Sequence, residues 1–120
     1  MSSRMEAIVF DCRDAEAQAA FWCAALDYEI TRRWQDKYGV EYVEANAEGA
    51  PMLLFYPVPD RKTAKNRVHL DVRATGSQYD EVARLVAIGA RVVDDDAMVP
   101  WVVLQDPEGN EFCVLPPRPE

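Results

Sequence analysis

The sequence has little positive charge and only one histidine. Its 13 lysines and arginines stand against 21 aspartates and glutamates, which gives a net charge of −8. Binding to nucleic acid or to an anionic membrane surface depends on basic residues that neutralise phosphates. The composition therefore predicts no nucleic-acid partner and no membrane partner, and it favours a neutral or cationic small molecule.

Long hydrophobic runs are also missing. No stretch approaches the roughly 20 apolar residues of a membrane-spanning helix, and "MSSRMEAIVF" lacks the charged start and apolar stretch of a secretory signal. The three cysteines, Cys12, Cys23 and Cys113, are odd in number and show no Cys-x-x-Cys spacing. This pattern predicts neither a disulfide framework nor a zinc finger. We expect a cytoplasmic protein with reduced thiols.

What is present suffices for one domain, residues 1–120, because 49% of the residues are hydrophobic. The first half has an alternating stretch at 6–13 and then an alanine-rich stretch at 14–26, which predict a strand and a helix capped by Asp14. Three further β-rich stretches follow at 28–36, 39–45 and 51–59.

The same order then begins again after a polar segment. The pattern predicts a strand at 67–74 and a helix at 77–89, capped by Ser77 and ended by Gly89. Three more strands are predicted, at 90–96, 100–105 and 111–116. The chain thus divides into module 1 at about 5–58, a linker at 59–66 and module 2 at about 67–117.

The two halves form a repeat of pattern. Placing Ala7 on His69 aligns the strand and helix of both halves, and "LLFYP" then lies over "FCVLP", which pairs Leu54 with Cys113. The segments "DAEAQAAFWCAALDYE", "NRVHLDV", "EVARLVAIGARVV" and "WVVLQDPEGNEFCVL" resemble the glyoxalase, bleomycin-resistance and extradiol-dioxygenase superfamily, also called vicinal oxygen chelate proteins. The resemblance implies an α+β fold of two β-α-β-β-β modules that form one curved, cleft-like mixed sheet with the helices outside, usually as a homodimer.

The resemblance also implies where a divalent metal would bind. The family's four ligand positions fall on Ala7, Leu54, His69 and Cys113; only His69 matches the usual ligand, and Cys113 stands where a glutamate is usual. Asp71 lies about 7 Å along the strand from His69, so it would need another geometry to join. Because a bound metal needs three or four converging donors, we expect no metal or other cofactor.

Strand alternation predicts which side chains share the cleft. In the strand at 67–74, Val68, Leu70 and Val72 are expected to pack under the helix, so that His69 and Asp71 face the cleft. The residues predicted to bind a small, partly apolar organic molecule there are Met52, Leu54, Tyr56, His69, Asp71, Trp101 and Cys113.

His69 has three readings: a metal ligand that has lost its partners, a general base, or a hydrogen-bonded wall residue. If any residue is catalytic, the sequence points to His69, although no nucleophile motif accompanies it. Three functions therefore stay open: a small-molecule-binding protein, a metal-dependent lyase, isomerase or dioxygenase-like enzyme, and a non-catalytic dimeric accessory module.

Overall fold

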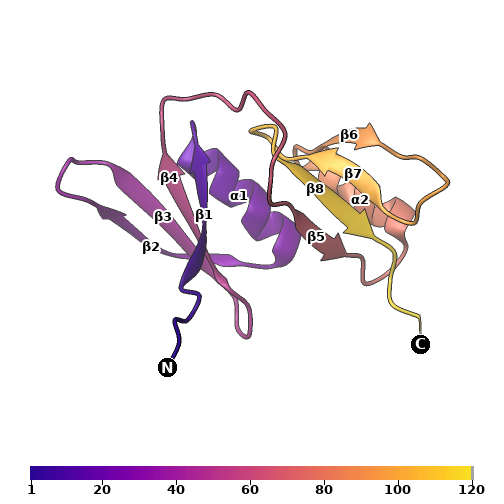
Figure 1. Cartoon of the computed structure of the whole chain (residues 1–120), viewed down its shortest axis with the longest axis horizontal. Helices are drawn as coiled ribbons and strands as arrows, with labels where there is room; N and C mark the ends of the chain where they lie inside the picture. Colours follow the sequence, from indigo (N-terminus) through magenta and orange to yellow (C-terminus); the bar gives the residue numbers. More distant parts are fainter. Residues whose placement is uncertain (120) are drawn as a thin grey trace. The chain divides into compact units, whose positions relative to one another are not determined.

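A computed structural model describes residues 1–119. In it the chain forms two compact units. Module one is Met1–Arg61 and module two begins at Lys62, so the boundary falls inside the predicted linker. Each module contains one helix and four strands in the order β-α-β-β-β (Figure 1). This confirms the predicted α+β fold of two repeated modules. Among the described residues, neither helix is long and apolar enough to cross a membrane.

Module one is a four-stranded mixed sheet with a helix. Its order in the sheet is β1-β4-β3-β2, with β1 parallel to β4 and the other neighbours antiparallel. The helix begins after Asp14, whose Oδ1 accepts a hydrogen bond of 3.0 Å from the backbone N of Ala17, as the sequence predicts. The elements are β1 (Ala7–Cys12), α1 (Ala15–Leu26), β2 (Glu29–Gln35), β3 (Glu41–Asn46) and β4 (Met52–Pro57).

The core of module one is rich in aromatic rings. Trp22 of α1 and Phe55 of β4 are fully buried, and the ring of Phe10 lies between them, with centroid distances of 5.6 Å and 5.1 Å. Along β4, Leu53 and Phe55 are buried while their neighbours are half-buried. One face of the sheet therefore packs on α1, and the other carries Met52, Leu54 and Tyr56.

Module two repeats this topology with shorter strands. The order in the sheet is β5-β8-β7-β6, again with the first pair parallel, and α2 lies along one face of the sheet (Figure 1). Ser77 caps α2 through a hydrogen bond of 3.2 Å from the backbone N of Asp80 to its Oγ, as predicted. The elements are β5 (Leu70–Arg73), α2 (Gln78–Ala87), β6 (Arg91–Asp94), β7 (Val102–Gln105) and β8 (Glu111–Leu115).

The register of the strands repeats as well as their order. Val9 on β1 is the partner of Leu54 on β4, and the residues aligned with them by the sequence repeat, Asp71 and Cys113, are likewise partners across β5 and β8. The alignment drawn from the sequence is thus confirmed at the level of strand pairing.

One prediction for module two is wrong. Val68 was expected under α2, but it is 82% exposed. Regular strand structure begins only at Leu70, which pairs with Phe112, so Val68 and His69 precede β5. The alternation of apolar and polar residues begins in the sequence before the first residue that has a partner strand. Where no partner strand is present, this alternation does not determine which way a side chain points.

Candidate functional site

A pocket of about 450 Å³ lies on the sheet of module two, on the face opposite α2. Alternation along β8 creates this face, because Phe112 and Val114 are buried while Cys113 and Leu115 are only half-buried. Strand pairing places Cys113 between Asp71 on β5 and Val103 on β7. The pocket is lined by Lys65, His69, Asp71, Trp101, Val103, Glu111, Cys113 and Leu115.

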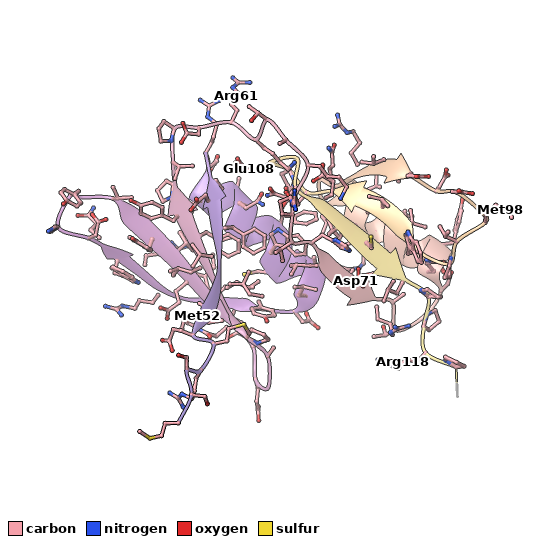
Figure 2. The ribbon with its side chains drawn as sticks, in the orientation of Figure 1. Met52, Arg61, Asp71, Met98, Glu108 and Arg118 are labelled. Carbon is pink, nitrogen blue, oxygen red and sulfur yellow. The ribbon has the colours of Figure 1, made fainter. Side chains whose placement is uncertain are left out.

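The structure brings together four of the seven residues that the sequence predicts for the site. His69, Asp71, Trp101 and Cys113 all line this pocket, and the label in Figure 2 marks Asp71 on β5. Trp101 precedes β7 and is 42% exposed, so its ring forms an open wall. The predicted set lacked the other four lining residues, which are Lys65 in the predicted linker, Val103, Glu111 and Leu115.

His69 and Asp71 make a polar contact in the pocket. The Nε2 atom of His69 lies 3.2 Å from Oδ1 of Asp71, with 44% and 52% of the two side chains exposed. Asp71 reaches His69 by a geometry other than that of a regular strand, because His69 lies just before β5 and both side chains are exposed enough to turn toward each other. Cys113 completes a cluster of three donor atoms that all lie within 4.8 Å of one another.

The surroundings of Cys113 in this pocket favour its neutral thiol form. Burial raises its pKa, and the carboxylate of Asp71 raises it further, while Lys65 opposes the change. A nucleophilic cysteine needs the thiolate, which a lowered pKa favours. The surroundings of Cys113 therefore disfavour a Cys-His nucleophile pair, although a cation bound at the sulfur would displace the proton.

Glu111, at the edge of the pocket, binds to the segment that precedes β5. Its carboxylate accepts a hydrogen bond of 3.0 Å from the backbone N of Asn66 and lies 3.0 Å from Nζ of Lys62. Burial, the largest single influence, raises the pKa of Glu111, but the bonds from Asn66 and Lys62 together lower it to about 2. Sequence reasoning took the segment around Lys62 for a plain linker. The sequence offers no local signal for this contact, because Asn66 and Glu111 are 45 residues apart along the chain.

The other predicted site residues belong to module one. Met52, Leu54 and Tyr56 share the half-buried face of β4, and Figure 2 labels Met52 where β4 begins. On this face Tyr56 joins a row of rings, since its centroid is 4.6 Å from Tyr42 and Tyr42 stacks on Trp34 at 4.2 Å. The convergence of this face with the module-two pocket on a single ligand stays a prediction.

The donor set of four that the resemblance implies does not fit this chain. Ala7 and Leu54 present only hydrocarbon, and they lie on β1 and β4 of module one. The donors present near the other two positions are His69, Asp71 and Cys113, all in module two. A metal bound near His69, Asp71 and Cys113 would therefore have a different set of ligands, which includes the sulfur of Cys113.

Solved structures share this fold. FosX of Listeria monocytogenes, a fosfomycin resistance protein, in complex with Mn(II) and dihydroxypropylphosphonic acid, is 15% identical with a TM-score of 0.76 over 96% of this chain and 93% of that chain. Trypanothione-dependent glyoxalase I of Leishmania major is 14% identical with a TM-score of 0.70 over 96% and 87%. A glyoxalase/bleomycin resistance protein/dioxygenase family enzyme of Burkholderia phytofirmans is 17% identical with a TM-score of 0.69 over 92% and 96%.

At these identities the structures show the fold alone. No curated protein sequence matches the chain. The sequence model of the glyoxalase-like domain, by contrast, matches residues 7–115, which includes every strand and both helices of the two modules. With its fold, its repeated register and this match in agreement, the chain belongs to the glyoxalase-like domain family.

Proposed function

We propose that the pocket of module two binds a small, partly apolar organic molecule. The observation that carries this proposal is the composition of one concave site of about 450 Å³. Trp101, Val103 and Leu115 offer apolar walls, and His69 and Asp71 offer polar contacts at one place. Ligand sites of this size are typically apolar with a few polar groups that fix orientation.

In this proposal His69 supplies a hydrogen bond and Trp101 supplies flat apolar area. The half-buried face of β4 with Met52, Leu54 and Tyr56 is a separate candidate surface of module one. Binding of the molecule requires no metal. The protein acts in the cytoplasm. It acts there as a homodimer, and sedimentation of the purified chain at several concentrations tests this oligomeric state.

A second function is supported by a separate observation. The fold is that of FosX, whose complex contains Mn(II), and three potential metal donors lie within 4.8 Å of one another in this pocket. A metal-dependent lyase, isomerase or dioxygenase-like activity is therefore the alternative, with His69 as the residue nearest to the reacting atoms. A dimeric module with neither ligand nor activity is the third reading.

The test is a thermal-shift screen of small neutral and cationic organic molecules against chelator-treated protein. His69→Ala removes one hydrogen bond, worth about 0.5–1.5 kcal/mol, and should weaken a bound molecule about three- to tenfold. Trp101→Ala should weaken it as well. Tyr79→Ala is the matched aromatic control, because Tyr79 lies on α2 and is 83% exposed outside the pocket.

The proposal is wrong if a molecule is found whose affinity is indifferent to both His69→Ala and Trp101→Ala. It is also wrong if Tyr79→Ala weakens binding as much as they do. The face of module one is tested separately with Tyr56→Ala. Turnover of a bound molecule that appears only after a divalent metal is added would favour the alternative.

A further inference from the structure

We infer that a second cavity of module two binds the carboxylate or phosphate group of a small molecule, through Lys65 and Arg91. The cavity measures about 420 Å³, and all the residues that line it belong to the unit that begins at Lys62. The inference goes beyond the small-molecule proposal, because the apolar walls of the first pocket, Trp101 and Leu115 among them, take no part in this cavity.

Strand pairing builds the floor of the cavity. Arg91 on β6 is the partner of Gln105 on β7, and Gln105 is the partner of Glu111 on β8. Residues that are directly paired point to the same face of a sheet, so these three side chains form a row across three strands. The backbone therefore sets their spacing before any ligand binds.

The segment before β5 supplies a wall beside this row. The carboxylate of Glu111 lies 3.0 Å from Nζ of Lys62, and Nδ2 of Asn66 donates a hydrogen bond of 3.2 Å to the backbone O of Glu111. Lys65 lies between these two tied residues and lines the cavity. Across from this segment, Figure 2 labels Glu108, in the turn that precedes β8.

Positive charge is in excess in this cavity. It has three cationic side chains and two carboxylates, Glu108 and Glu111, although the whole chain has 13 basic and 21 acidic residues. The ion pair between Lys62 and Glu111 balances one charge of each sign. Within the described part of the chain, neither Lys65 nor Arg91 forms an ion pair. Two cations then stand against one carboxylate, which favours an anion and disfavours a cation.

The side chain of Arg91 is held in place with donors to spare. Its Nη2 donates a hydrogen bond to Oε1 of Gln105, which is neutral and therefore leaves the guanidinium charge unbalanced. A guanidinium has five N–H donors in a planar fork that matches two oxygens of a carboxylate or a phosphate. The ammonium of Lys65 adds a compact charge and three donors. A cavity of this volume falls within the range of about 300–1,000 Å³ for small-molecule sites, so the anionic group belongs to a small molecule.

The experiment uses the full chain in a buffer free of other oxyanions. Inorganic phosphate and, separately, acetate are titrated in, with sodium chloride at equal ionic strength as the control. Amide chemical shifts measured by NMR should change and saturate in the segment 62–66 and around Arg91 and Gln105, and chloride should not reproduce the change. Saturation by phosphate identifies a phosphate group as the ligand group, whereas saturation by acetate alone identifies a carboxylate.

Four variants test which residues bind the anion. Lys65→Gln and Arg91→Gln should each weaken binding at least about tenfold, because each removes hydrogen bonds from a charged group. Gln105→Glu should weaken it further, because the new carboxylate pairs with Arg91 and repels the anion. This variant should unfold at the same temperature as the wild type or a higher one, which separates lost binding from lost folding. Lys37→Gln, in an exposed turn of module one, is the matched charge control and should change nothing.

Two results would overturn the inference. One is a set of shifts that never saturates or that sodium chloride reproduces. The other is an equal loss of affinity in Lys37→Gln and Arg91→Gln, which would mean attraction by net charge alone. Lys65 and Arg91 are exposed, so their variants should fold, and thermal unfolding verifies this. Trp101→Ala should leave phosphate binding unchanged, so the result here and the result for the apolar pocket are independent.

Discussion

At the residue scale, Glu111 lines the edge of the pocket and also connects two segments of module two. It joins the first residue of β8 to the segment before β5 through Asn66 and Lys62. Only 13% of its side chain and 19% of that of Lys62 are exposed. A partly buried ion pair with an added backbone hydrogen bond is worth more than an exposed pair.

We therefore predict an acid-sensitive contribution from Glu111. Its pKa is about 2 in the folded protein, below the ordinary value of 4.5, so the unfolded chain takes up a proton first as the pH falls. The stabilisation is complete above about pH 5 and is lost between there and about pH 2; at most it amounts to about 3 kcal/mol. Urea unfolding at several pH values should show this loss in the wild type.

Glu111→Gln is the variant for this test. It should lower the free energy of unfolding at pH 7 by about 1–3 kcal/mol and flatten its pH dependence over the same window. Glu48→Gln, in an exposed turn of module one, is the matched control. Equal pH profiles for the wild type and Glu111→Gln would contradict the assignment.

The contact between His69 and Asp71 shows what the sequence leaves open at this scale. Alternation correctly predicts that Asp71 and Cys113 share a face. It does not predict that two neighbouring side chains turn toward each other across 3.2 Å. That depends on rotamers and on local exposure, which the order of the letters does not specify.

At the scale of elements, the two helices have the same place in their modules but unequal packing. α1 buries five side chains, including Phe21 and Trp22, whereas in α2 only Leu85 is buried. Tyr79 and Val86 of α2 remain exposed. Because tertiary packing supplies most of the stability of a helix, α2 depends more heavily on its cap.

We predict that Ser77→Ala loosens α2 selectively. Loss of a serine cap costs about 1 kcal/mol, which should speed amide exchange in α2 about fivefold and leave α1 unchanged. Hydrogen exchange followed by NMR or mass spectrometry measures both helices in one sample. Thr75→Ala, two residues earlier in the exposed bend, is the control, and Ser77→Asp should restore protection. A uniform change in both helices would show that the cap acts globally.

The sequence predicts every element, because caps and turns mark their ends. Asp14 and Ser77 begin the helices, and the buried Asp106 accepts two backbone hydrogen bonds, of 2.9 Å and 3.0 Å, in the turn before β8. The start of β5 is the exception. Its first paired residue depends on where β8 runs beside it, and that is a long-range contact that no local pattern contains.

At the scale of the whole molecule, acidic residues outnumber basic ones by 21 to 13. The net charge of −8 repels phosphate backbones, and nucleic-acid affinity comes largely from cations that neutralise them. We therefore predict no retardation of duplex DNA or single-stranded RNA in an electrophoretic assay at low salt, with a basic protein of similar size as the positive control. A shifted band that disappears with added salt would contradict this prediction.

The bond network of Glu111 also determines where a protease can cut. Arg61 is exposed, but the ammonium of Lys62 is held by the carboxylate, and the peptide bond after Lys65 ends at the amide of Asn66, which donates to the same group. Within the linker at 59–66, trypsin should therefore cleave after Arg61 first, and mass spectrometry should find fragments that divide the two β-α-β-β-β units. In Glu111→Gln, Lys62 and Lys65 become equally good sites. One carboxylate in the last strand thus decides which bonds of the linker at 59–66 are open to proteolysis.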